Sequence, residues 1–347
     1  MKEINCNIVE LNKDVEPFVI QASRTRAPHY FKNIYGDKFK PLTFVHSADM
    51  HNAKQMWDRM VQYINYYKDY ISFGLHTGDY CGGIQELNTD MYEECTPCER
   101  TIYNCMGNHD AVSNDEWSHP ADKKKSYDIT FKHANEWDVN FADCEYPMSY
   151  YKDFEESNIR MIVLDLYYDV WGTRLWLGKV LEDAKEKGLN VITAMHEPTD
   201  YIVESFGVYY HHADDYEMAQ KMGEIKRTDG AFDHRGRVLF EDIIADFIER
   251  GGNYICNFAG HDHIDSFGLT EKGVLNVVVQ NGTDWDELGD SRRVEGTKSY
   301  DCFNVVGIDT EIGVLKIIRI GDNVDHLMRK KSVLCFDYKN RKVVYQG

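Results

Sequence analysis

Five short clusters of polar residues follow one another along the chain, and their side chains are of the kinds that bind metal ions. In order they are Asp49-Met50-His51, Gly78-Asp79, Gly107-Asn108-His109-Asp110, Ala194-Met195-His196-Glu197-Pro198 and Gly260-His261-Asp262-His263. Manganese, iron, zinc and magnesium ions accept carboxylate oxygen, amide oxygen or neutral imidazole as ligands. The clusters therefore hold enough ligands to chelate two divalent metal ions.

A site for two metal ions also needs a bridging carboxylate, because two like charges held close together repel each other. Asp79 stands alone between the flanking clusters and is the natural bridge. Asp49 is separated by one residue from His51, so both side chains of an extended segment project to the same side, as do the two histidines of the last cluster. Two metal ions about 3.5 to 4 Å apart can hold the attacking and leaving oxygens of a phosphoryl group and generate hydroxide near neutral pH. The pattern predicts hydrolysis of a phosphate ester.

The segments that must position these clusters are short apolar runs, each followed at once by a cluster. The runs cover residues 42–48, 72–77, 101–106, 190–195 and 254–259. We expect them to be buried strands, and we expect helices over residues 52–67, 173–187 and 240–250, where apolar residues recur at helical spacing. Each cluster then lies just beyond the carboxyl end of a strand, where open α/β sheets bind their ligands.

The last third of the chain is rich in β-forming residues. Its runs cover residues 274–280, 302–309, 314–320 and 332–344, the last with a turn at Lys339-Asn340. We expect these strands to form a second sheet that packs face to face on the first.

No repeat or linker divides the chain, so we expect one domain over residues 1–347. Within it we distinguish an N-terminal extension (1–40), two polar insertions (111–145 and 200–237) and a C-terminal β extension (321–347). Insertions of this length are usually functional, so they are candidate walls of a substrate pocket.

The composition limits what the chain can bind. A formal net charge of −19 argues against long nucleic acids and anionic membrane surfaces as partners, and favours a small molecule. Residues 1–17 lack an apolar signal segment and no later run approaches a membrane span, so we expect a cytoplasmic protein. Nine cysteines, an odd number in a chain this long, favour reduced thiols. The oligomeric state stays open.

The ordered set Asp-x-His, Gly-Asp, Gly-Asn-His-Asp, His and Gly-His-x-His resembles the calcineurin-like metallophosphoesterase superfamily over about residues 42 to 265. The resemblance implies an α/β fold, a four-layer α/β/β/α sandwich of two mixed β-sheets of the metallo-dependent phosphatase type. It also implies a metal-dependent phosphodiesterase or phosphatase that acts through a metal-bridging hydroxide. Its two divalent metal ions would be manganese, iron (ferrous or ferric) or zinc.

The same resemblance assigns a role to each matching residue. The first metal ion would be bound by Asp49, His51, Asp79 and His263, and the second by Asp79, Asn108, His196 and His261. His109 would donate a proton to the leaving oxygen or stabilise the transition state, and Asp110 would orient it. For the substrate, Arg292 and Arg293 could hold phosphate oxygens. Tyr209 and His211, in the second insertion, could stack on a nucleobase or sugar, or they could belong to a loop that only packs on the sheet edge.

The purple acid phosphatase branch has a tyrosine three residues after the bridging aspartate, and this chain has Gly82 there, so a tyrosinate-bound ferric site is not expected. Two alternatives to a small-molecule phosphoesterase stay open: a nuclease of the same superfamily, and a scaffold of this fold that binds without catalysis. Scaffolds of that kind generally lack some ligands, whereas this chain keeps the full set, which favours the enzyme.

Other residues that could bind metals have simpler explanations. His46 and His76 lie inside apolar runs and are expected to be core histidines. Cys95 and Cys98 have the spacing of zinc ligands, but no second pair of suitable spacing accompanies them. Cys81, two residues after Asp79, is expected to pack as a small apolar side chain.

Overall fold

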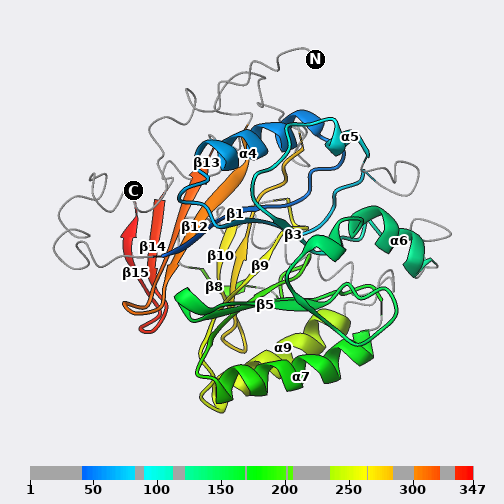
Figure 1. Cartoon of the computed structure of the whole chain (residues 1–347). Helices are drawn as coiled ribbons and strands as arrows, with labels where there is room; N and C mark the ends of the chain where they lie inside the picture. Colours follow the sequence, from blue (N-terminus) through cyan, green and yellow to red (C-terminus); the bar gives the residue numbers. More distant parts are fainter. Residues whose placement is uncertain are drawn as a thin grey trace.

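Two mixed β-sheets pack face to face in the computed structural model, with helices on their outer faces (Figure 1). The structure describes residues 41–82, 90–111, 122–168, 170–200, 202–205, 235–263, 265–283, 301–320 and 333–346. The layers follow the order α/β/β/α, which confirms the predicted fold class.

In the described part of the chain, the first sheet has seven strands in the order β15-β14-β13-β12-β1-β2-β3. The strands are β1 (Leu42–Ser47), β2 (Phe73–His76), β3 (Ile102–Asn104), β12 (Phe303–Asp309), β13 (Val314–Ile320), β14 (Val333–Asp337) and β15 (Lys342–Gln346). Strands β1, β2 and β3 are mutually parallel neighbours, whereas β12 runs antiparallel to β1. The carboxyl ends of β1 to β3 therefore meet at one edge.

The second sheet, counted over the same residues, has eight strands in the order β4-β5-β6-β7-β9-β11-β10-β8. They are β4 (Asn140–Phe141), β5 (Tyr150–Phe154), β6 (Ile159–Val163), β7 (Asn190–Ala194), β8 (Ile202–Ser205), β9 (Tyr254–Ala259), β10 (Ser266–Thr270) and β11 (Leu275–Val278). Its central strands β6, β7, β9 and β11 are parallel. Their carboxyl ends also share one edge.

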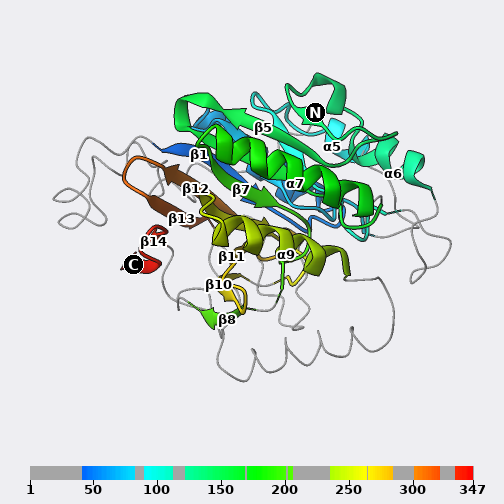
Figure 2. The same cartoon turned by 90° about the horizontal axis from the view of Figure 1, so that it is seen from below.

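Helices cover the two outer faces (Figures 1 and 2). On the first sheet lies α4 (Lys54–Tyr66), which buries Met56, Met60 and Ile64 at helical spacing. On the second sheet lie α7 (Val170–Glu186) and α9 (Arg235–Glu249), which contact each other. The shorter helices are α5 (Asp90–Glu93), α6 (Lys123–Thr130), η3 (Ala134–Glu136) and η4 (Glu155–Ser157).

The strands before the five clusters and helices α4, α7 and α9 lie close to where the sequence predicts them, whereas β4 to β6, β8 and β10 were not predicted. The division of the strands between the sheets was predicted wrongly. The β-rich tail does not form a sheet of its own, because β12 to β15 extend the sheet that contains β1 to β3. Strands β7 and β9 belong to the opposite sheet, where β11 pairs with β9. Apolar periodicity shows that a strand is buried, but it does not choose the strand's partner, which depends on contacts distant in sequence.

The predicted insertions are described only in part. Residues 122–145 contain α6, η3 and β4, and the second insertion contributes β8 and the start of α9. The N-terminal extension lies outside the described residues. Among the helices that the structure does describe, none is both long and apolar enough to cross a membrane.

Aromatic side chains join the two sheets at the centre of the core. The ring of Phe44 on β1 stacks on Phe73 of β2 with centroids 4.7 Å apart, and meets Phe258 of β9 edge-on at 5.3 Å. All three side chains are buried. The contacts among their rings therefore hold the two sheets at a fixed distance from each other.

We expect Phe44→Ala to lower the free energy of unfolding by about 3 to 5 kcal/mol, because it removes a fully buried ring and leaves a cavity between the sheets. Urea unfolding followed by circular dichroism measures this change. Leu175→Ala on α7, where the side chain is 71% exposed, is the control and should change the stability by less than about 0.5 kcal/mol. A loss of similar size in both variants would contradict the assignment of Phe44 to the core.

Candidate metal centre

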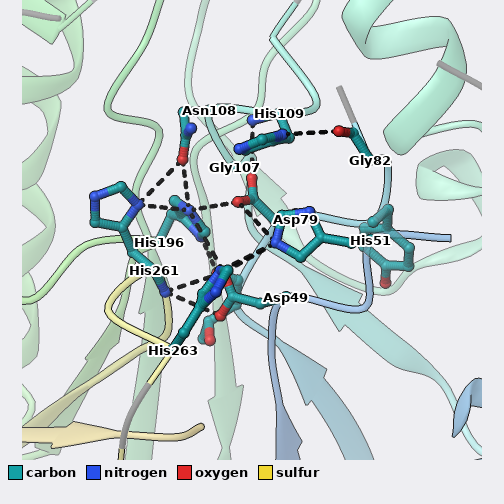
Figure 3. Close-up of polar contacts among 12 residues, drawn as sticks. Asp49, His51, Asp79, Gly82, Gly107, Asn108, His109, His196, His261 and His263 are labelled. Carbon is teal, nitrogen blue, oxygen red and sulfur yellow. Dashed lines mark hydrogen bonds and ion pairs between the residues drawn. The ribbon is translucent and has the colours of Figure 1, made fainter. Parts of the chain in front are cut away.

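Loops from both sheets bring the five polar clusters together at one place (Figure 3). Asp49, Asp79 and Asn108 follow β1, β2 and β3 of the first sheet, while His196 and the His261–His263 loop follow β7 and β9 of the second. The site therefore lies where the carboxyl ends of parallel strands from the two sheets meet. This is where α/β folds bind ligands, since the loops there diverge and leave room.

The backbone of these loops is unusual. Five residues of the site have positive φ angles: Asp49 (54°), His51 (44°), Asp79 (59°), His261 (67°) and His263 (56°). The left-handed region is costly for residues with a side chain, and it persists where surrounding contacts enforce it. Here the left-handed backbone turns each of the five side chains from the end of its strand into the common site.

Two motif glycines allow the loops to approach one another. A Cβ atom on Gly107 would lie 2.1 Å from Asp79 Oδ1 and 2.2 Å from Asp79 N. A Cβ atom on Gly260 would lie 2.4 Å from Asp49 Oδ2. Any side chain at either position would therefore displace a carboxylate of the site.

One group of four side chains surrounds a first candidate position for a metal ion. Asp49, His51, Asp79 and His263 each offer a ligand atom, and all four atoms lie within 4.8 Å of one another. His263 Nε2 lies 3.4 Å from Asp49 Oδ1 and 3.0 Å from His51 Nε2. Imidazole nitrogens that face each other and a carboxylate in this way could hold a metal ion.

A second group shares Asp79 with the first. His196 Nε2 lies 3.3 Å from Asp79 Oδ2 and 2.9 Å from Asn108 Oδ1. His261 Nδ1 lies 3.1 Å from the same Asn108 oxygen and 3.2 Å from His196 Nε2. Asp79 thus lies between the two groups, as expected of a bridging carboxylate.

The charges of the site are strongly coupled. Burial by itself would raise the pKa of Asp79, but the adjacent His196 and other imidazoles hold it well below its usual range. Burial would lower the pKa of His196, yet the Asp79 carboxylate beside it raises this pKa to about 10. The two buried carboxylates of Asp49 and Asp79 stay ionised and attract positive charge, and the raised pKa of His196 places such a charge beside them.

Backbone groups orient the ligands. His196 Nδ1 lies 2.7 Å from the Thr77 carbonyl oxygen, which directs Nε2 towards Asp79. Backbone N–H groups of His261 and His109 donate to the carboxylates of Asp49 and Asp79, respectively, at 2.9 Å.

His109 lies at the rim of the site, but its orientation differs from the prediction. Its Nδ1 is 3.1 Å from the carbonyl oxygen of Gly82, and its ring meets that of His51 edge-on. Asp110 does not orient this ring. Its buried carboxylate accepts backbone N–H groups instead.

The carboxylate of Asp110 holds the loop after β2 against the loop after β3. It accepts the N–H groups of Asp79 (2.9 Å), Cys81 (3.0 Å) and Gly107 (3.0 Å). Burial and the nearby Asp79 carboxylate raise the pKa of Asp110 to about 6, against the effect of these donors. The sequence motif could not reveal this role, because two of the three donors, Asp79 and Cys81, lie on the loop after a different strand.

Several residues singled out in the sequence lie apart from the site or beyond the described residues. Those beyond them are Arg292, Arg293, Tyr209 and His211. His46 and His76 are buried core histidines, and burial lowers the pKa of each to about 3, so both are neutral. Cys81 packs in the apolar cluster under α4, as expected.

Cys95 and Cys98 do not gather further metal ligands. Cys95 packs in the same apolar cluster as Cys81, and its thiol lies 3.7 Å from the Lys54 carbonyl oxygen. Within the described residues, neither cysteine belongs to a group of His, Cys, Asp and Glu side chains that could hold a metal ion. Neither forms a disulfide with another of the described cysteines.

Two side chains beside the site were not predicted from the sequence. The hydroxyl of Tyr167 donates to Glu197 Oε1 at 3.3 Å, and its ring centroid is 6.3 Å from that of His196. Glu197 is buried and belongs to the fourth cluster, which was a signal for it. Nothing in the sequence around Tyr167 indicated its position.

We expect Gly107→Ala to weaken metal binding sharply, because the new methyl group would collide with the carboxylate and amide of Asp79. Elemental analysis after dialysis against a metal-free buffer measures retained metal. Gly178→Ala on α7 is the matched control: its methyl group meets no atom within 4 Å, and alanine favours a helix by about 0.5 to 1 kcal/mol over glycine. If Gly107→Ala retained as much metal as the control, the close approach would be irrelevant to the site.

Comparison with known proteins supports the fold through structure alone. No family model matches the sequence, and no match was found among curated proteins. Among solved structures, a dimetal phosphatase from Danio rerio is similar with a TM-score of 0.54 and 11% sequence identity, over 86% of this chain and 100% of that one. Together with the buried aspartate and histidine cluster, which is consistent with a binuclear metal site, this likeness shows that the chain has the calcineurin-like metallophosphoesterase fold.

Proposed function

We propose that this protein is a binuclear metal-dependent phosphoesterase that hydrolyses a phosphate ester of a small molecule. The observation that carries the proposal is the convergence of Asp49, His51, Asp79 and His263 within 4.8 Å, on the fold of a dimetal phosphatase. Structural polar residues at strand ends would serve as separate caps and turns. They would not aim their ligand atoms at a common point.

Each metal ion would have three ligands of its own, and the two ions would share a fourth ligand. Asp49, His51 and His263 would hold the first ion, Asn108, His196 and His261 would hold the second, and Asp79 would bridge them. The donor set of carboxylate, amide oxygen and imidazole suits manganese, iron or zinc. When bound, such ions supply charge stabilisation to a phosphoryl group and lower the pKa of water.

His109 is the candidate proton donor. Its Nδ1–H donates to the Gly82 carbonyl oxygen, which leaves Nε2 available. When the ring is protonated, Nε2–H can give its proton to a leaving oxygen. The backbone N–H of the same residue donates to Asp79, which fixes the ring relative to the bridge. His109 is only half-buried, so a substrate can reach it.

The charge of the chain favours a small substrate over a nucleic acid. A net charge of −19 repels a long polyanion, whereas a single phosphate ester can be neutralised by two divalent ions. Both phosphodiesters and phosphomonoesters fit this reasoning. Arg292, Arg293, Tyr209 and His211 remain proposed substrate contacts.

We expect Asp79→Asn to abolish metal-dependent hydrolysis while the fold is retained, because the amide keeps the size of the side chain but loses the bridging charge. The test is turnover of bis(p-nitrophenyl) phosphate and p-nitrophenyl phosphate by protein reconstituted with manganese, iron or zinc, with circular dichroism as the check of folding. Full turnover by the folded variant would refute the proposed function.

We expect His109→Ala to lower turnover by about 10²-fold or more with both metal ions still bound, the size of a general acid contribution. Metal content and steady-state kinetics are measured on the same preparation. His133→Ala, which removes an exposed histidine beside Glu93, is the matched control and should retain full turnover. Loss of metal from His109→Ala would show that this residue binds metal and is no proton donor.

A further inference from the structure

Arg319 lies buried between the two sheets, on β13, with its guanidinium directed at segments that lead to the metal centre. Its Nη1 is 3.4 Å from Asp265 Oδ1, and its Nη2 donates to Gln280 Oε1 at 3.0 Å. The same nitrogen donates to the thiol of Cys302, which precedes β12. The residue is 2% exposed, so these contacts form away from solvent.

The contact with Asp265 reaches the loop that carries two histidines of the site. Asp265 is fully buried and comes two residues after His263. Its Oδ1 also accepts the backbone N–H of Gln280 at 3.0 Å. The ion pair therefore fixes the end of the His261–His263 loop, next to the point where His263 turns into the site with a positive φ.

The contact with Gln280 reaches the loop that carries Asp49. Two residues beyond Gln280, the N–H of Gly282 donates to the carbonyl oxygens of Ala48 (2.9 Å) and Asp49 (3.0 Å). Thr283 N–H donates to the same Asp49 carbonyl at 3.2 Å. Segment 280–283 thus holds the backbone of Asp49, while Arg319 holds the side chain of Gln280, the first residue of that segment.

We propose that Arg319 is a positioning residue that sets the distance between Asp49 and His263. These two ligands of the first metal ion are held by the segments that Arg319 contacts. The proposal rests on the metal centre of the proposed function. A planar guanidinium fixes the directions of several acceptors at once, which the single ammonium of a lysine does not. A buried ion pair contributes little net stability compared with apolar side chains of the same volume, so its effect is geometric.

The test compares Mn²⁺ binding to metal-free wild-type protein and to Arg319→Lys. Lysine keeps the positive charge near Asp265 but cannot span Asp265, Gln280 and Cys302 together. We expect the affinity of the first metal ion to fall by about 10- to 100-fold, as for other residues that orient metal ligands, with the second ion bound as in the wild type. Isothermal titration calorimetry gives both affinities, and the electron paramagnetic resonance spectrum should change from that of a coupled manganese pair to that of an isolated ion.

Arg160→Lys is the matched control. Arg160 on β6 is also fully buried and bonded to a carboxylate, with Nε and Nη2 donating to Asp153 at 2.6 and 2.7 Å. Its Nη1 donates to the Val180 carbonyl of α7, on the face of the second sheet away from the metal centre. This variant should lose stability without any change in either Mn²⁺ affinity.

Asp265→Asn provides a second variant, since the amide keeps the oxygen that accepts from Gln280 but loses the charge paired with Arg319. Asp265→Asn should lower the affinity for the first metal ion in the same way. If Arg319→Lys does not fold, Asp265→Asn alone tests the proposal. Wild-type affinities in both variants, or an equal loss at both metal positions, would overturn the proposal. If the wild type binds Zn²⁺ or Fe²⁺ in place of Mn²⁺, the same titrations are made with that ion. Wild-type protein that binds none of the three ions would instead refute the proposed function.

Discussion

Two ionised carboxylates, Asp49 and Asp79, are buried side by side where the sheets meet, and the structure around them is organised to compensate that charge. Burial favours the neutral form of a carboxyl group, yet the neighbouring imidazoles keep the pKa of each below its usual value. The loops reach this arrangement only through left-handed backbone at the ligand residues and through glycines at points of contact. The local strain is therefore concentrated at the place where chemistry is expected.

The rest of the fold supplies the rigidity that this site needs. The apolar cluster between the sheets, centred on Phe44 and its aromatic neighbours, fixes the separation of the strands from which the ligands project. Polar contacts then set the finer geometry at the edge: Asp110 joins the loops after β2 and β3, and Arg319 joins the first sheet to the loop after β9. Packing brings the loops close, and directional bonds decide where each ligand atom lies.

Much of this arrangement could be predicted from local sequence. The apolar runs before each cluster predicted the strands, and β9 (Tyr254–Ala259) has the predicted bounds. Helical spacing predicted α4 and α7 to within a few residues. The paired Asp49 and His51 predicted a metal site because ligand type and spacing are themselves properties of the sequence. The substrate contacts proposed in residues 200–237 and 284–300 lie outside the described residues.

Side-chain chemistry and short-range periodicity are local properties, so the order of residues alone identifies which of them can bind metals and predicts that each follows a buried strand. Long-range contacts set the remaining features: the strands divide between two sheets, the β-rich tail joins β1, and Asp110 clamps two loops where an orienting contact to His109 was expected. These features depend on hydrogen bonds and packing between segments tens to hundreds of residues apart. Arg319 and Asp265 meet across such a separation, so their contact exists only in the folded chain.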